Sequence, residues 1–219
     1  ATRRTADTSP AELAELMVGR KVLLRVDKTP AKPGAVVLQA EGLRVVDSHG
    51  VERLRGIDLN IRAGEILGIA GVAGNGQSEL LEVIAGMIPG TGSLMMNGKP
   101  LDLSCRHDDA HKRREAGIGH VHEDRHRCGL VLNFTAWENI AFGYHNAPEY
   151  NRNRLFMDND AIRRDARGKI ERFDVRPDNC WLTGESFSGG NQQKIVLARE
   201  IERNPDLLLV GQPTRGVDI

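Results

Sequence analysis

Phe187-Ser188-Gly189-Gly190-Asn191-Gln192-Gln193-Lys194 is the stretch that decides the fold of this 219-residue chain. It lies downstream of a glycine-rich frame, Gly71-Val72-Ala73-Gly74-Asn75-Gly76-Gln77-Ser78, and upstream of the apolar run Leu207-Leu208-Leu209-Val210. Each of the three elements is a type that handles phosphate in proteins. Their order predicts a nucleotide-driven machine.

The Ser188-Gly189-Gly190 turn has the composition of an anion site. A hydroxyl and two residues without Cβ at the start of a helix provide backbone N–H groups, a positive helix dipole and room for close approach. Asn191 continues the same motif into the expected helix. A plain serine cap with flexible glycines is the alternative interpretation of these residues.

The glycine frame resembles a phosphate loop, but one charged residue is missing. Gly71, Gly74, Gly76 and Ser78 stand where such a loop needs them, and Ser78 is the expected Mg²⁺ ligand. Gln77 occupies the lysine position, so the loop brings no positive charge to the terminal phosphates. A glycine-rich turn without a ligand therefore remains open. The expected nucleotide contacts in this frame are Gly71, Val72, Ala73, Gly74, Asn75, Gly76, Gln77 and Ser78.

The apolar run Leu207–Val210 predicts a buried strand, and no acidic residue follows it directly. A strand of this kind usually carries one acid for Mg²⁺ and a second that polarises the attacking water. Gly211 and Gln212 occupy these two positions. Gln212, at the catalytic position, can orient a water but cannot accept its proton.

The expected fold is α/β with a parallel core. Glu65–Ala70 is expected to enter the glycine loop as a buried strand, and a helix is expected over Ser78–Ala85. Period-two runs within Ala35–Ile61 predict antiparallel strands. The other expected elements are a helix from Ser9 to about Val18, a strand over Lys21–Val26, a hairpin near Gly92–Lys99, mostly helix over Leu103–Thr183 with loops at Asp124–Gly129 and His145–Asn153, and a helix over Asn191–Glu202.

Composition excludes several function classes. The chain has 30 basic and 30 acidic residues, which opposes a general nucleic-acid surface. Three cysteines without framework spacing indicate reduced thiols, and no apolar stretch is long enough to span a membrane. A zinc site is a weaker alternative, since its imidazole and thiolate donors lie too close in sequence for easy tetrahedral closure. These donors would be His120, His122, His126 and Cys128.

With these motifs in place, the chain resembles the ATP-binding subunit of an ABC transporter. Phe187–Lys194 is similar to the signature motif, Gln212–Asp218 to the Walker B tail and D-loop, and Gly117–Arg125 to the Q-loop region with Glu123 at the usual Gln position. The narrower resemblance is to the second of two tandem domains in simple-sugar and nucleoside importers. Phe173–Pro177 leans toward the nucleoside branch.

The resemblance implies an ABC ATPase fold with an antiparallel β subdomain, a parallel core sheet and a helical subdomain at about 103–190. Residues 1–34 would be an inter-domain linker segment, and 35–219 a nucleotide-binding domain truncated before the switch histidine. The implied cofactors are ATP and Mg²⁺, with Glu123 and Ser188, Gly189, Gly190 and Asn191 as further nucleotide contacts. The implied partners are the first nucleotide-binding domain of the same polypeptide, transmembrane permease subunits and, indirectly, a periplasmic or lipid-anchored solute-binding protein.

The architecture of the family implies a mechanism in which the two ATP sites are unequal. Two such domains sandwich two ATP molecules, each held by one domain's phosphate loop and the other's signature. The intact signature at Ser188 would then serve the partner's ATP, while the loop ending in Gln77 would be catalytically impaired. The implied location is cytoplasmic, peripheral on the inner face of the cell membrane. A nucleotide-independent interaction domain and a non-transport ABC ATPase are the alternatives.

Overall fold

The computed structural model describes residues 8–9, 12, 15–16, 29–105, 109–152 and 156–212. The chain divides into two compact units, 1–32 and 33–219. In the first unit the backbone N–H of Glu12 donates to Ser9 Oγ at 3.2 Å, which is the cap that the sequence predicts. Glu12, Glu15 and Leu16 are helical. The strand expected at 21–26 lies outside the described residues.

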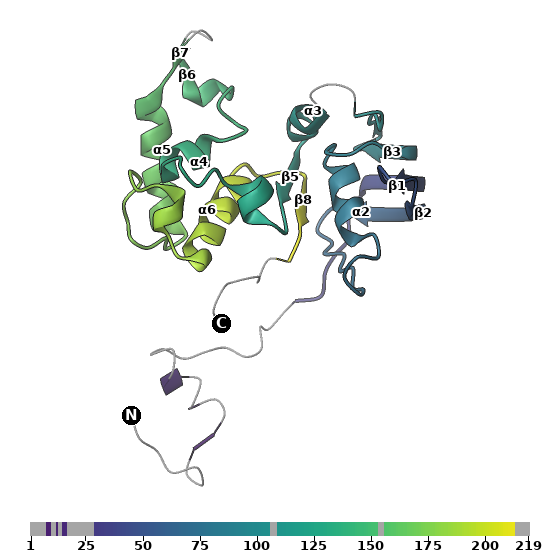
Figure 1. The fold of residues 1–219 in the computed structure, drawn as a ribbon, viewed down its shortest axis with the longest axis horizontal. Coiled ribbons are helices and arrows are strands. Elements are labelled where there is room, and N and C mark those ends of the chain that lie inside the picture. The colour runs from purple at the N-terminus through teal and green to yellow at the C-terminus, as the bar shows by residue number, and fades with distance from the viewer. Residues whose placement is uncertain are drawn as a thin grey trace. The chain divides into compact units, whose positions relative to one another are not determined.

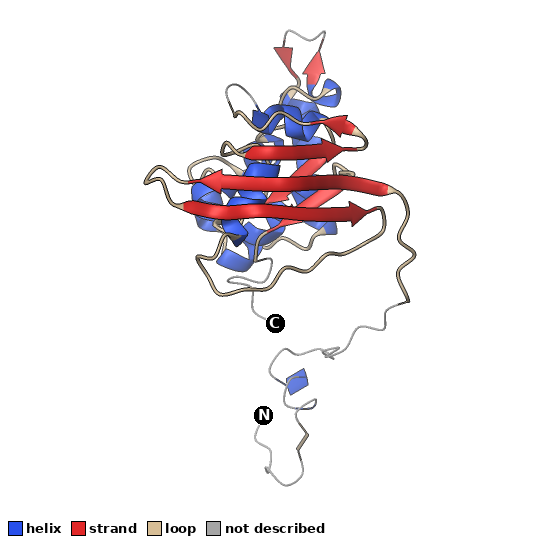
Figure 2. Ribbon diagram, turned by 90° about the vertical axis from the view of Figure 1, so that its right-hand side faces the viewer, coloured by secondary structure: helices blue, strands red, loops and turns tan. Residues whose placement is uncertain are grey.

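The second unit begins with an antiparallel sheet. Its strands are β1 (Val36–Val46), β2 (Glu52–Arg62), β3 (Thr91–Met96) and β4 (Lys99–Pro100), in the order β2-β1-β3-β4 (Figure 1). Helices pack against one face of this sheet (Figure 2). The antiparallel strands predicted from the period-two runs and the hairpin expected near Gly92–Lys99 are therefore both confirmed.

A short parallel pair forms the centre of the second unit. Strand β5 (Ile118–Val121) pairs with β8 (Leu207–Val210) in register from Ile118 opposite Leu207 to Val121 opposite Val210. Leu207 and Leu209 belong to the hydrophobic cluster that contains α2 (Gln77–Ile84). Leu208 and Val210 pack against the cluster that contains α6 (Gly189–Ile201). The pair is thus covered on both faces, as parallel strands require.

The strand β5 corrects one expectation, because 103–183 was expected to be mostly helical. This strand has only four residues of mixed polarity, Ile118-Gly119-His120-Val121. Periodicity cannot distinguish so short a run from a loop. The π-helical turn Arg125–Gly129 likewise replaces part of an expected loop. The other elements of this region are α3 (Asp109–Glu115), α4 (Ala136–Ala141), a 3₁₀ turn Pro148–Tyr150, β6 (Asn151–Arg152), β7 (Phe156–Met157), α5 (Asn159–Arg172) and a 3₁₀ turn Gly184–Ser186.

Glu65–Ala70 does not form the expected strand. The segment is irregular and exposed, with Ile66 94% and Ile69 55% accessible to solvent. An apolar run predicts a preference for burial, but a strand also needs a neighbour that accepts its ladder hydrogen bonds. In the part of the chain that the structure describes, β5 and β8 pair only with each other. The segment therefore has no ladder partner there.

The buried side chain of Asn139 organises the entry into α4. Its amide oxygen accepts from Val131 N at 2.9 Å, and its amide nitrogen donates to the carbonyls of Val131, Phe134 and Thr135 at 3.0–3.1 Å. The side chain is fully inaccessible to solvent. One residue thus satisfies four backbone groups of the turn before the helix.

Replacing Asn139 with Leu should destabilise the chain by at least about 2 kcal/mol. The apolar side chain has a similar size but removes the partner of the Val131 N–H, at roughly 1–3 kcal/mol for the unsatisfied donor, and one of the two hydrogen bonds that each of the Val131, Phe134 and Thr135 carbonyls accepts, at about 1 kcal/mol for each bond. Urea unfolding followed by circular dichroism measures the difference. A matched change at the exposed Asn133 should cost much less; equal costs at the two positions would contradict the role given to Asn139.

Candidate nucleotide site

The phosphate loop is anchored where it enters α2. Gly76 precedes the helix with φ of 98°, a left-handed conformation that glycine adopts without strain. A Cβ at this position would lie 2.8 Å from the carbonyl oxygen of Arg53 and 2.9 Å from Leu54 in β2. Gly76 is therefore required both for the turn and for close packing on the sheet.

The amide of Gln77 folds back into its own loop. Its Nε2 donates to the Val72 carbonyl at 3.1 Å, and its Oε1 accepts from Asn75 N at 3.2 Å. Asn75 Nδ2 also donates to the Val72 carbonyl, at 3.0 Å. A neutral amide can donate and accept at once, whereas a lysine ammonium only donates. In this conformation Gln77 uses the Asn75 N–H that a phosphate oxygen would otherwise take.

Ser78 and Glu123 bring two oxygen donors together. Ser78 Oγ donates to Glu123 Oε1 at 2.6 Å, across 45 positions in sequence. Both side chains are half-buried. A hydroxyl and a carboxylate are oxygen ligands of the kind that Mg²⁺ takes, so these residues fit the metal that accompanies ATP.

The backbone around Glu123 is fixed on both sides. Gly211 N donates to the Val121 carbonyl at 2.8 Å, which extends the β5–β8 pairing up to Glu123. Asp124 N donates to His122 Nδ1 at 3.0 Å, and the Asp124 carboxylate caps the π-helical turn through His126 N and Arg127 N. The position of Glu123 is thus determined by the end of β5.

The two residues after β8 carry no acid, as the sequence shows. Gly211 is buried, and Gln212 is exposed with φ of 45°. Positive φ is uncommon for a residue with a side chain and marks an abrupt end to the extended strand. The Val210–Gln212 segment therefore ends at the same edge as Glu123, but without a side-chain carboxylate of its own.

The signature residues lie at an open helix terminus. Ser188 is exposed, and α6 begins at Gly189 without a side-chain cap. Instead of capping, Ser188 Oγ accepts from Asn191 Nδ2 at 2.9 Å, and Asn191 Oδ1 accepts from Arg176 N at 2.8 Å. A 13-residue helix whose first N–H groups lack a side-chain cap offers donors and a positive dipole to an anion.

The candidate residues form two separate groups. Gly71–Ser78 and Glu123 lie together at α2 and the end of β5, whereas Ser188–Asn191 stand at the start of α6 on the other side of the β5–β8 pair (Figure 1). In the described ranges no hydrogen bond joins the phosphate loop to the signature residues.

Gln192 is a connection that the sequence analysis missed. Its Oε1 contacts His126 Nε2 at 2.8 Å and accepts from Arg125 Nε at 3.3 Å, while its Nε2 donates to the Gly184 carbonyl at 3.0 Å. It thereby joins the signature helix to the turn that follows Glu123. The only sequence signal was its place beside the signature, which says nothing about its partner.

The histidines near β5 do not assemble as a metal site. Within the residues that the structure describes, no group of three or more His, Cys, Asp or Glu side chains could hold a metal ion. His126 is engaged with Gln192, and His122 Nε2 lies 3.4 Å from Glu82. Burial, followed by the electrostatic effect of the neighbouring His122, lowers the pKa of His120 to about 4.

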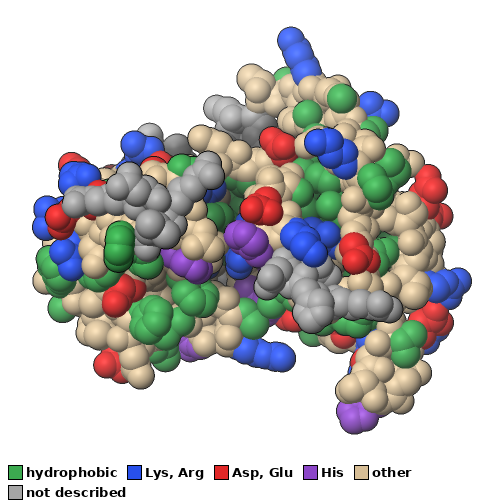
Figure 3. Space-filling model, turned by 90° about the horizontal axis from the view of Figure 1, so that it is seen from above, with side chains coloured by type: hydrophobic (Ala, Val, Ile, Leu, Met, Phe, Trp, Pro, Cys, Tyr) green, Lys and Arg blue, Asp and Glu red, His purple; other side chains and the backbone are tan. Residues whose placement is uncertain are grey.

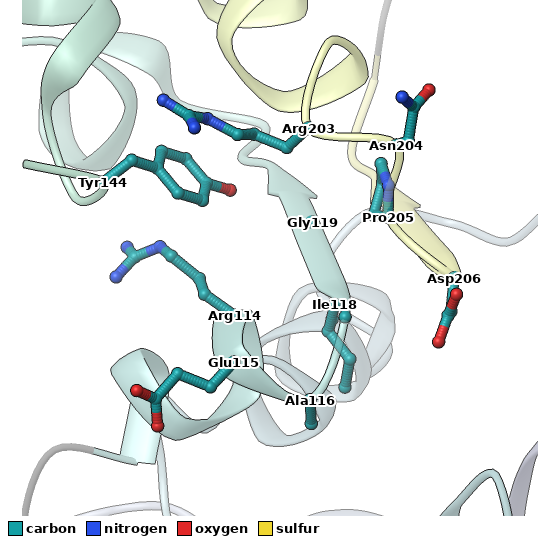
Figure 4. A pocket seen from close by; sticks show the side chains of 11 residues that line it. Arg114, Glu115, Ala116, Ile118, Gly119, Tyr144, Arg203, Asn204, Pro205 and Asp206 are labelled. Atoms are coloured by element: carbon teal, nitrogen blue, oxygen red, sulfur yellow. The ribbon is translucent and has the colours of Figure 1, made fainter. Parts of the chain in front are cut away.

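A separate cavity of about 160 Å³ lies at the other end of the strands (Figure 4). It is lined by Gly117, just before β5, and Asp206, just before β8, whereas Glu123 lies beyond the other end of β5. The guanidinium carbon of Arg114 lies 5.6 Å from the centroid of the Tyr144 ring, and that of Arg203 lies 4.8 Å from it. Both cations thus stack on an aromatic face. The phosphate loop does not contribute to this cavity.

The surface is mixed in charge. On the face seen in Figure 3, basic, acidic and hydrophobic side chains are interspersed, in keeping with the balance of 30 basic and 30 acidic residues in the whole chain. Among the described residues, none of the helices combines the length and the apolar character that crossing a membrane requires.

Comparison with known proteins identifies the family. The model for "ABC transporter" matches residues 54–215, which include the phosphate loop, Glu123 and the signature. The chain belongs to the ABC transporter family. Its α/β fold, with an antiparallel sheet and a parallel pair, is the ABC ATPase fold expected from the sequence.

Two relatives and one solved structure place this ABC domain more closely. It is 45% identical to the nucleoside import ATP-binding protein NupA of Lactococcus lactis over 100% of the chain and 42% of that protein. It is 42% identical to the glucose import ATP-binding protein TsgD13 of Haloferax volcanii over 100% of the chain and 39% of that protein. The structure of cbiO1 from Clostridium perfringens, part of the ABC transporter complex cbiONQ, matches with a TM-score of 0.62 and 26% identity over 84% of this chain and 68% of cbiO1.

The low pKa of His120 makes the stability of this ABC domain pH-dependent. Between pH 6.5 and about 4 the unfolded chain binds a proton at this position that the native chain does not. The free energy of unfolding should therefore fall as the pH drops through that window. In His120→Gln the fall should be shallower, as measured by urea melts across the same range. The exposed His49 provides the matched control, and an equally steep fall in His120→Gln would contradict this assignment.

Proposed function

We propose that this chain is a nucleotide-binding domain of an ATP-driven importer of simple sugars or nucleosides. The chain spans about 42% of the length of NupA, so the activity of a whole transporter is part of the proposal. Import ATP-binding proteins for a nucleoside and for glucose are similarly close relatives, which supports the substrate class without choosing between its members. Residues 1–34 would serve as a linker segment and 35–219 as the domain.

The observation that carries the proposal is the contrast between the two motifs. The Ser188 terminus of α6 is exposed and lacks a side-chain cap, as a surface that receives a partner's phosphate must be. In the phosphate loop, the Gln77 amide bonds to the backbone of Val72 and Asn75, and no lysine is present. The two positions after β8 carry no acid either. In a tandem protein, this chain would complete the ATP site of the first domain and hydrolyse little at its own.

ATP and Mg²⁺ are the implied ligands, held by Gly71–Ser78 with Glu123. ATP would supply the free energy that closes the two domains on each other. The implied partners are the first nucleotide-binding domain, the membrane permease subunits and, through them, a solute-binding protein. The chain would then work in the cytoplasm, peripheral to the inner face of the membrane.

The 219-residue chain should show negligible ATPase activity by itself. Losing the lysine charge and the general base together should cost several factors of ten in rate. A phosphate-release assay with Mg²⁺ compares the chain with Ser78→Ala, which removes the expected metal ligand. Turnover well above that control would show that the site is catalytically competent and overturn the impaired-site assignment.

In the whole transporter, Ser188→Arg should impair transport severely and Gln77→Ala only mildly. A bulky cation at Ser188 would occupy the space of the partner's terminal phosphate and should abolish transport and most ATP hydrolysis. Gln77→Ala removes only a neutral amide that binds its own loop and should be mild.

A reconstituted transport assay measures both variants, with Ser186→Arg, just before the signature, as a matched control. If Ser188→Arg proved as mild as Gln77→Ala, the domain would be a scaffold and not a donor of a half-site. Photolabelling of the whole protein with azido-ATP, with label counted only on peptides from residues 1–219, separates this outcome from a domain that uses no nucleotide.

A further inference from the structure

A buried carboxylate in the last turn of α6 attaches the signature helix to two other parts of the domain. Glu200 is only 3% exposed. Its Oε2 accepts from the Tyr144 hydroxyl at 2.6 Å and from His120 N at 3.3 Å. Its Oε1 accepts from Arg199 Nε at 2.8 Å. The carboxylate therefore joins α6 to β5 and to the turn that follows α4.

The neighbouring residue Arg199 secures the same end of the helix on a second side. It is 4% exposed, and its Nη1 donates to the carbonyls of Gly129 at 2.9 Å and Asn139 at 3.2 Å. Arg199 and Glu200 form a buried ion pair, and such a pair usually adds little to net stability because both charges lose their hydration. The main structural effect of this pair is directional: its hydrogen bonds fix the end of α6 against its neighbours.

The ring of Tyr144 is held in place independently of its hydroxyl. Figure 4 shows the ring between the side chains of Arg114 and Arg203, whose guanidinium carbons lie 5.6 and 4.8 Å from its centroid. Arg203 also lies 4.7 Å from the centroid of the Tyr150 ring and forms an ion pair with Glu149. These cation–π contacts depend on the ring alone, so they would remain if the Tyr144 hydroxyl were removed.

The helix α6 is a rigid connection between this attachment and the signature. Glu200 follows Ser188 by 12 positions, which corresponds to about 18 Å along an α-helix. A tilt of about 5° at the Glu200 end would therefore move the Ser188 end by about 1.5 Å. A misplacement of about 1 Å can lower the rate of a reaction between positioned groups by about a hundredfold.

We infer that Glu200 and Tyr144 are positioning residues, which orient α6 so that Ser188 reaches the terminal phosphate held by the partner domain. This assignment rests on the proposed function, in which the signature completes the ATP site of the first domain. Both residues act from the far end of the helix, and neither belongs to the signature itself. The role depends on the reach of the Glu200 side chain, because its Oε2 must meet the Tyr144 hydroxyl and His120 N together.

The test separates the reach of the Glu200 side chain from its charge. In the reconstituted whole transporter, phosphate release gives kcat and the KM for ATP, and thermal melting gives the stability of each variant. Glu200→Asp keeps the charge but is shorter by one methylene group, so kcat should fall by about tenfold or more. The KM for ATP should be unchanged, because the phosphate loop of the first domain would bind the nucleotide.

Glu200→Gln is the complementary variant. Its amide oxygen can still accept from the Tyr144 hydroxyl and from His120 N, so kcat should change little. The melting temperature should fall further than in Glu200→Asp, because Arg199 is left as a buried charge without its partner. Stability should thus follow the charge and kcat the reach. The reverse pattern in kcat, normal in Glu200→Asp and low in Glu200→Gln, would overturn the inference.

The two tyrosines of the chain provide a matched pair that leaves the buried charges in place. Both rings contact Arg203, but the Tyr144 hydroxyl bonds to Glu200, whereas the Tyr150 hydroxyl bonds to Asp165 in α5. Tyr144→Phe should lower kcat by about threefold or more at an unchanged KM. Tyr150→Phe removes the same atom from the neighbouring ring and should keep the kcat of the unaltered protein.

Ser188→Arg, measured in the same assay, separates this inference from the proposed function. If Ser188→Arg abolishes hydrolysis while Tyr144→Phe and Tyr150→Phe have equal kcat, the positioning role is wrong and the proposed function stands. If Ser188→Arg leaves hydrolysis intact, the proposed half-site is wrong and the inference falls with it. A raised KM at an unchanged kcat in Glu200→Asp would also overturn the inference, since the loss would then be in ATP binding.

Discussion

The pairing of β5 with β8 is the constraint on which the site depends. Each strand has four residues, yet the pair separates two hydrophobic clusters and is buried on both faces. Backbone hydrogen bonds from Leu207 N to Gly117 and from Gly211 N to Val121 close the pair at its two ends. A change of register by one residue would exchange the faces of Leu207 and Leu208 and move Glu123 away from Ser78. The geometry of the nucleotide site is therefore set by the packing of the strand pair.

The same pair links the two candidate phosphate-binding motifs. On one side, Ser78 in α2 bonds to Glu123 directly after β5. On the other, Gln192 in α6 bonds to His126 and Arg125 in the turn that follows. A displacement of the Glu123 segment would thus be transmitted to the signature helix through a contiguous set of hydrogen bonds. This physical connection is what a domain needs if occupancy at one motif is to affect the other.

Local turn chemistry could be predicted from the sequence, whereas long-range pairing could not. The Ser9 cap, the hairpins of β1–β4 and the starts of α2 and α6 each depend on a few neighbouring residues, and they lie where the sequence indicates. Glu65–Ala70 was expected as a strand because of its apolar residues, but a strand depends on a neighbour far away in sequence. The contacts of Glu123 with Ser78 and Gly211 span 45 and 88 positions, and no local pattern predicts them.

The four changed positions at this edge of the strands give the missing charges a common explanation. An ABC site of the usual pattern carries one lysine, two acids and a neutral glutamine, whereas this chain has Gln77, Gly211, Gln212 and Glu123 at those positions. The formal charge of the four positions is the same in both patterns, because one cation and two anions are lost and one glutamine becomes an anion. What changes is the location: the remaining carboxylate lies where a metal would be held, and none lies where a water would be deprotonated. If the chain binds nucleotide as proposed, this distribution would leave the site without a base to hydrolyse ATP, so weak catalysis would follow from one rearrangement of charge.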